Sequence, residues 1–151
     1  MQLYNKLSAK ERAALLEEAG EDRLTLSFYQ YAKIGNPHLF RNHLFIAWEQ
    51  MDVLGRIYVA HEGINAQLSV PAKRFDEFKA FIDNIYFLEN VRLNIAIEHD
   101  LKSFLKLKVK VRDKIVADGL NDETFDVTNK GIHVDALTFN ELIEDPDTVL
   151  V

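Results

Sequence analysis

The sequence predicts an α+β domain in which two helices cover one face of an antiparallel sheet. Apolar and polar residues alternate, with the period of β-strands, in segments near 24–31, 56–60, 64–70 and 91–97. Apolar residues instead recur with the helical period near 37–52 and 72–85. The resulting order of strand, helix, strand, strand, helix, strand is the ferredoxin-like, or acylphosphatase-like, pattern. An extra alternating segment, 105–112, predicts a fifth strand, and residues 8–20 predict an N-terminal helix.

Local signals mark where the helices begin. Ser8 followed by Glu11 is a capping box, in which each side chain bonds a backbone N–H group of the first turn. Asn36 followed by Pro37 predicts the start of the first covering helix, because proline is well suited to the first helical position. Pro71 similarly precedes the second covering helix.

Residues 55–71 predict a β-hairpin in the middle of the chain, with a short polar link between its two strands. The motif in and after this link contains a histidine, an acid, a glycine and an amide: His61, Glu62, Gly63 and Asn65. A histidine and a carboxylate beside a glycine could perform general acid–base chemistry. Alternatively, they stabilise the turn and its packing, so the role of this motif is left open.

Charge is distributed unevenly along the chain. The net charge is −6, but residues 90–117 carry seven basic and three acidic side chains, whereas residues 118–151 carry one and nine. The chain has no cysteine, which excludes disulfides and a cysteine nucleophile within these residues and fits a reducing compartment. No apolar run approaches the roughly 20 residues that cross a bilayer, and the charged N-terminus is unlike a signal peptide. These features favour a cytoplasmic protein.

The fifth strand places its cations on one side, because side chains alternate along a strand. The row consists of Lys106, Lys108, Lys110 and Arg112, and Lys114 extends it. If the apolar residues face the helices, the same open face of the sheet also carries Tyr29, Tyr31, Arg56, Tyr58, Asn65, Gln67, Arg92 and Asn94. Aromatic side chains among cations suit RNA, since bases stack on rings and phosphates meet Lys and Arg. The alternative is a solvated face whose lysines protect an edge strand from aggregation.

Other chemistries find little support in the sequence. His38 and His43 lie five residues apart on a helix and His133 is isolated, so no metal site is predicted. The fold allows an acylphosphatase-like enzyme, and the segment 32–42 contains Arg41 between the first strand and the first covering helix. That segment lacks the glycine-rich cradle that would bind a phosphate.

Several blocks of sequence resemble one known family. They are SFYQY at 27–31, GRIYVAHEGINAQLSVP at 55–71, RLNIAI at 92–97, KVKVRDKIVADG at 108–119 and LTFNELIEDPDTVLV at 137–151. In this order they are similar to the N-terminal part of the bacterial tRNA wobble-uridine hydroxylases, a rhodanese-related family. The resemblance spans nearly the whole chain.

The resemblance implies an enzyme that converts the wobble uridine of tRNA to 5-hydroxyuridine, with molecular oxygen as co-substrate and no other identifiable cofactor. The family's presumed catalytic cysteine belongs to its rhodanese domain, and no residue here matches it. We therefore expect this chain alone to be inactive and assign it no catalytic residue. The implied partners are tRNA and a downstream rhodanese domain, with no membrane.

The expected organisation is a ferredoxin-like domain at 1–118, a linker at 119–136, and the start of a truncated rhodanese-like domain at 137–151. Three interpretations of the first domain remain: it binds tRNA, it braces the rhodanese domain through its open face, or it is a small-molecule-binding or phosphatase-like module.

Overall fold

The computed structural model describes residues 3–98, 100, 102–116, 126–129 and 131–150 of the chain. Their elements are α1 (Ala9–Ala19), β1 (Arg23–Tyr31), α2 (Pro37–Gln50), β2 (Leu54–Ala60), β3 (Gly63–Pro71), the 3₁₀ turn η1 (Ala72–Arg74), α3 (Phe75–Asp83), β4 (Asn94–Ile95), β5 (Leu107–Val111) and α4 (Ala136–Glu144). The strands form one sheet in the order β4-β1-β3-β2-β5. The predicted ferredoxin-like arrangement is confirmed. Within the described residues, no helix is long and apolar enough to span a bilayer.

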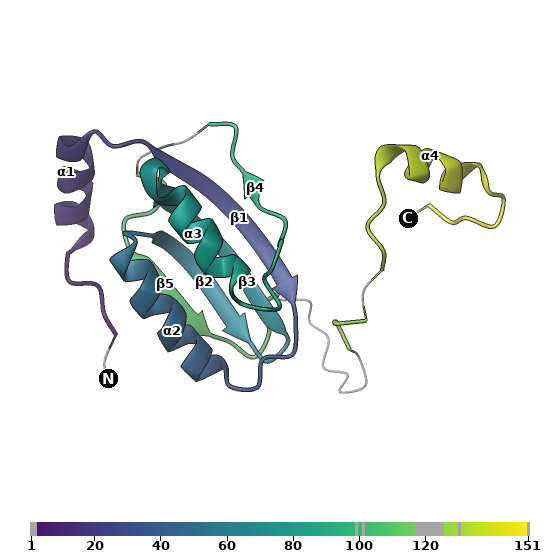
Figure 1. Ribbon diagram of the computed structural model, residues 1–151, viewed down its shortest axis with the longest axis horizontal. Coiled ribbons are helices and arrows are strands. Elements are labelled where there is room, and N and C mark those ends of the chain that lie inside the picture. Colours follow the sequence, from purple (N-terminus) through teal and green to yellow (C-terminus); the bar gives the residue numbers. More distant parts are fainter. Residues whose placement is uncertain (1–2, 99, 101, 117–125, 130, 151) are drawn as a thin grey trace.

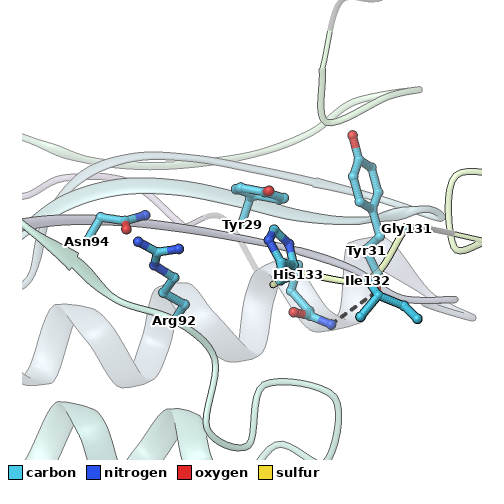
Figure 2. A pocket seen from close by; sticks show the side chains of 8 residues that line it. Tyr29, Tyr31, Arg92, Asn94, Gly131, Ile132 and His133 are labelled. Atoms are coloured by element: carbon cyan, nitrogen blue, oxygen red, sulfur yellow. Dashed lines mark hydrogen bonds between the residues drawn. The ribbon is translucent and has the colours of Figure 1, made fainter. Parts of the chain in front are cut away.

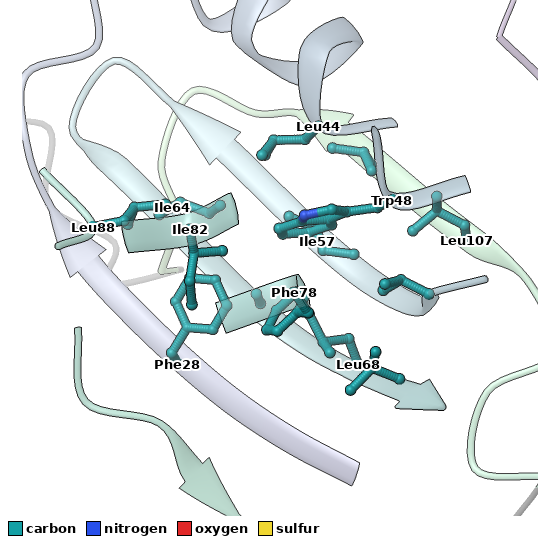
Figure 3. Packing of buried hydrophobic residues seen from close by; sticks show 14 of the residues in the cluster. Phe28, Leu44, Trp48, Ile57, Ile64, Leu68, Phe78, Ile82, Leu88 and Leu107 are labelled. Carbon is teal, nitrogen blue, oxygen red and sulfur yellow. The ribbon is translucent and has the colours of Figure 1, made fainter. Parts of the chain in front are cut away.

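Helices α2 and α3 lie across the same face of the sheet (Figure 1). The core fills the space between them and the strands, and Trp48 of α2 and Phe78 of α3 lie at its centre with ring centroids 5.6 Å apart (Figure 3). Both side chains are fully buried, as are Ile57, Ile64 and Leu68 on the strands below them. Burying each such side chain contributes roughly 1.5–3 kcal/mol, so this layer fixes which face of the sheet points inward.

The side chains of strand β5 face the predicted sides of the sheet, but the strand does not run in the predicted direction. Leu107 and Val109 are each 3% exposed, whereas Lys108 and Lys110 are exposed, so the cations do project from the face opposite the helices. The strand pairs with β2 in parallel, however, and the expectation of a single antiparallel sheet over residues 24–112 is wrong for this strand. Alternation gives the face but is the same for either strand direction.

Strand β4 is much shorter than the sequence predicted. The alternation over 91–97 predicted a full strand with its apolar side chains inward, but only Asn94 and Ile95 pair with β1. Ile95 pairs with the buried Leu26 and so lies on the helix side of the sheet, but it is 48% exposed, and Ile97 is 99% exposed. The expectation that these two side chains are buried is therefore wrong. The apolar edge that they form is available to another part of the protein.

Helix α1 begins with the predicted capping box, with both reciprocal bonds between Ser8 and Glu11 present. Hydrogen bonds from the Ser8 hydroxyl and backbone lower the pKa of the Glu11 carboxyl. A charged cluster ties α1 to the start of the sheet: Arg12 and Arg23 contact the two carboxylate oxygens of Asp52, at 2.8 and 3.2 Å. The Arg23 side chain is buried, which lowers its pKa, and it also donates to the Ser69 hydroxyl.

The C-terminal part contains helix α4, which coincides with the beginning of the segment 137–151 that is expected to start a second domain. Asp135 caps it by accepting a hydrogen bond from the Thr138 backbone at 2.8 Å. The helix lies apart from the sheet (Figure 1), and its apolar side chains Leu137, Phe139, Leu142 and Ile143 are 41–75% exposed. The residues described at 126–129 and 131–135 form neither helix nor strand, and residues 119–125 and 130 of the predicted linker lie outside the described residues. The domain boundaries at 118 and 137 stay predictions.

Candidate nucleic-acid interface

The open face of the sheet is organised in rows set by the strand register. One row runs across four strands through Ser27, Gln67, Arg56 and Lys108. The next row, two residues away on each strand, runs through Tyr29, Asn65, Tyr58 and Lys110. Because neighbouring strands lie about 4.8 Å apart, the three spacings between Tyr29 and Lys110 amount to roughly 14 Å. Aromatic rings and cations therefore share one continuous surface, as the sequence predicted.

Most of the predicted cations on this face are solvent-exposed and have no acidic partner. Arg56, Arg92, Lys108, Lys110 and Arg112 are exposed, and none forms an ion pair with any residue that the structure describes. The guanidinium of Arg112 instead lies 5.5 Å from the centre of the Tyr58 ring, a cation–π contact. Like charges on neighbouring strands repel one another, so this surface favours an anion in front of it.

The predicted residues at the margins of the row differ from those at its centre. Lys106 is half-buried and precedes β5, and Lys114 is half-buried beyond it. Tyr29 is 51% exposed, whereas Tyr31 and Tyr58 are half-buried. Tyr29 is therefore the aromatic residue of this face that is best placed to contact a ligand.

The free edge of β5 is already protected by two side chains, Asn5 and Arg41, whose contacts with this strand the sequence did not indicate. The Asn5 amide both donates to the Leu107 carbonyl and accepts from the Leu107 N–H, each at 2.9 Å. Arg41 of α2 donates from Nε to the Val109 carbonyl at 3.0 Å. These bonds occupy backbone groups on the outer side of the edge strand, while the lysines project from the face of the sheet. The alternative in which the lysines only protect the edge from aggregation is therefore less well supported.

A basic pocket lies at one corner of the open face, between α1, β2 and the segment before β5. Its volume is about 410 Å³, and its lining includes four cations: Arg56, Lys102, Lys106 and Lys108. Among the lining residues that the structure describes, none is acidic. Lys102 forms a salt bridge with Glu17 of α1. Lys102 is absent from the predicted row of cations because it lies outside the alternating strand pattern. A pocket with this lining suits a phosphate group.

The His61–Glu62 motif makes structural contacts at the other end of the face. The Glu62 carboxylate accepts a hydrogen bond from the Ile115 N–H at 2.8 Å, and the Asn65 amide donates to the Ile115 carbonyl at 3.3 Å. His61 contacts the Ile34 carbonyl through Nδ1 at 2.9 Å. These bonds hold the segment after β5 and the loop after β1 against the hairpin, which favours the structural alternative over acid–base chemistry.

Gly63 supports the same junction by its small size. Its φ is +148°, and a Cβ atom there would lie 2.1 Å from the Gln30 carbonyl oxygen. The backbones of β1 and β3 can approach this closely only with glycine at this position.

The loop between β1 and α2 is committed to the fold rather than to phosphate binding. The N–H groups of Ala32 and Ile34 donate to the carbonyls of Glu62 and His61, each at 2.9 Å. Arg41 is bonded to Val109 and to the Asn42 side chain. Two N–H groups of this loop and two nitrogen atoms of Arg41 are thus bonded within the fold, which weighs against the phosphatase-like alternative.

These features define an acylphosphatase-like domain whose candidate site is a cationic sheet face rather than the loop after its first strand. The chain belongs to the family described as the UPF0176 acylphosphatase-like domain, whose family model matches residues 23–115.

The chain is also similar to curated bacterial proteins named tRNA uridine(34) hydroxylase. It is 49% identical to that of Pectobacterium carotovorum subsp. carotovorum (strain PC1) over 150 residues, covering 99% of this chain and 42% of the relative. It is 47% identical to that of Leptospira interrogans serogroup Icterohaemorrhagiae serovar Lai (strain 56601) over 149 residues, covering 99% of this chain and 40% of the relative. The chain thus spans less than half the length of the curated relatives that it matches.

Proposed function

We propose that this chain is the tRNA-binding, N-terminal part of an enzyme that hydroxylates uridine 34 of tRNA to 5-hydroxyuridine with molecular oxygen. The observation that carries the proposal is the open face, on which five exposed cations form no ion pair within the described part of the chain. A tRNA backbone is a dense polyanion that would meet them. The proposed substrate, uridine 34 of tRNA, is taken from the names of the relatives. Such a substrate would place the protein in the cytoplasm.

The chemistry itself belongs, in this proposal, to the part of the relatives that this chain does not cover. The chain has no cysteine, and the His61–Glu62 pair is occupied by contacts within the fold. The chain alone should therefore bind tRNA without hydroxylating it, and a rhodanese domain of the same protein would supply the reactive group.

The test is the salt dependence of tRNA binding by the chain with Lys108 and Lys110 both changed to alanine. Each phosphate contact releases condensed counterions, so losing two should reduce the slope of log K against log salt by roughly 1.4–1.8. Affinity for tRNAs of different sequence should fall about equally, since phosphate contacts carry no base information. Binding is measured by fluorescence anisotropy with labelled tRNA across a salt series.

The matched control is the double change Lys73→Ala and Lys79→Ala, which removes the same charge near the start of α3 and within it. Both control lysines are at least partly exposed and pair with acids in their own neighbourhood, Glu21 and Asp83. Urea denaturation of both variants checks that the fold is intact. An unchanged slope and affinity in the Lys108/Lys110 variant, with the same result in the control, would refute tRNA binding by this face.

One observation favours a second role, in which the domain braces the rest of the protein. Ile95 and Ile97 form an exposed apolar edge at β4, and apolar edges of this kind are covered in many assemblies. Bracing would use the edge of the sheet, whereas tRNA binding would use its open face. The two roles are therefore compatible.

A further inference from the structure

A second pocket lies at the β1–β4 side of the open face, opposite the basic pocket. Its volume is about 520 Å³, within the usual range for small-ligand sites. Its walls come from distant parts of the chain: Tyr29 and Tyr31 on β1, Arg92 and Asn94 at β4, and Ile132 and His133 from the segment before α4 (Figure 2). Sequence reasoning named the β1 and β4 residues, but it treated His133 as isolated.

The lining of this pocket combines flat rings with hydrogen-bonding groups and a cation. The Tyr29 ring meets the Tyr31 ring edge-on, with centroids 6.0 Å apart and an interplanar angle of 70°, so the two rings are not stacked on each other. The Asn94 amide offers both a donor and an acceptor, and it makes no side-chain hydrogen bond within the described residues. No acidic side chain is present among the described residues that line the pocket.

This set of groups matches the parts of a nucleotide. A base has an apolar flat face, which a tyrosine ring can stack on, and a polar edge, which an asparagine amide can pair with. Its phosphate is an anion, for which the exposed guanidinium of Arg92 is a suitable partner. In an RNA duplex the bases are stacked and paired, so a concave pocket of this kind suits only a base that is unpaired.

We propose that this pocket binds one unpaired nucleotide of an RNA loop, with its base on Tyr29, its base edge at Asn94 and its phosphate at Arg92. The inference rests on the proposed function and adds the single-stranded character of the bound segment. The row that contains Tyr29 also contains Lys110, roughly 14 Å away across the sheet, so one strand of RNA can reach both. The cations then hold the backbone while the pocket holds a base.

The test uses an RNA stem-loop in which single loop positions carry the fluorescent base 2-aminopurine, whose emission falls when it stacks on a ring. The 151-residue chain should quench one loop position. Tyr29→Ala should abolish this quenching and weaken stem-loop binding roughly 5- to 150-fold, with little change in the salt slope. Tyr29→Phe keeps the ring and should retain both quenching and affinity, while Asn94→Ala should reduce the preference among bases at that position.

The matched control is Tyr86→Ala, which removes a tyrosine that is 81% exposed and lies outside the pocket lining. Equal quenching by a fully paired duplex with the same labelled base would overturn the inference. So would saturable binding of uridine monophosphate in the pocket with no quenching of the stem-loop, since the ligand would then be a free nucleotide.

The two proposals fail separately. If Tyr29→Ala and Asn94→Ala leave stem-loop affinity and quenching unchanged while the Lys108/Lys110 variant still binds weakly, the nucleotide pocket is wrong and the phosphate-binding face stands. If the lysine variant is also unchanged, the tRNA-binding function falls with it.

Discussion

Glu62 should be the main side chain holding the segment after β5 in place, and its removal is a sharp test of the junction described above. Its bond to the Ile115 N–H is charge-assisted and partly buried, a class that contributes roughly 1.5–3 kcal/mol. Ile115 is only 3% exposed, and burial of such a side chain contributes roughly 1.5–3 kcal/mol. Part of that contribution would also be lost if the segment were released. We expect Glu62→Ala to lower the free energy of unfolding by roughly 2–4 kcal/mol.

The variant Glu62→Gln keeps an oxygen acceptor at the same place and loses only the charge. It should cost about 1 kcal/mol, because a neutral hydrogen bond is about half as strong as a charge-assisted one. Stability is measured by urea denaturation, followed through the fluorescence of Trp48, which is fully buried and alone of its kind in the sequence.

The matched control is Gln67→Ala: Glu62 lies in the turn just before β3, and Gln67 lies on β3 with an exposed side chain. It should change stability by less than about 0.5 kcal/mol. Hydrogen exchange adds a local measurement, since the Ile115 amide should lose its protection in Glu62→Ala only. If Glu62→Ala resembles the control in both measurements, the contact seen between Glu62 and Ile115 does not hold this segment.

Two further changes probe the framework of the sheet. Gly63→Ala would place a Cβ atom 2.1 Å from a backbone carbonyl oxygen of β1, so we expect it to lower the free energy of unfolding in urea by an amount on the order of 3 kcal/mol. The control is Gly35→Ala, where a Cβ atom would meet nothing within 4 Å and the free energy of unfolding should hardly change. Equal losses in the two variants would show that the close approach at Gly63 does not matter. Arg23→Met leaves the buried hydroxyl and carbonyl of Ser69 without this donor, and it should lower the free energy of unfolding by roughly 2–4 kcal/mol. Arg12 contacts the same carboxylate of Asp52 but is more exposed, so Arg12→Met should lower it by less than about 1 kcal/mol. A reversed order of these two arginine variants by thermal denaturation would show that burial does not set their contributions.

The sequence by itself determined the order of the elements and the faces of the strands. Alternation placed Leu107 and Val109 inward and Lys108 and Lys110 outward, and the structure agrees, because a slip of one residue would bury cations and expose the core. The capping box at Ser8 was equally readable, since both of its partners lie within one turn. Such features depend on neighbours in the sequence or on one face being apolar.

Only the tertiary structure decided which neighbour each element meets. The parallel direction of β5 and the shortness of β4 do not follow from alternation, because the same pattern fits either direction and says nothing about where pairing stops. The Glu62 contact joins residues 53 positions apart, and the nucleotide pocket joins Tyr29 to His133. A side-chain pattern specifies which face is buried, but hydrogen bonds and pockets between distant segments depend on the closure of the whole chain, which no local period records.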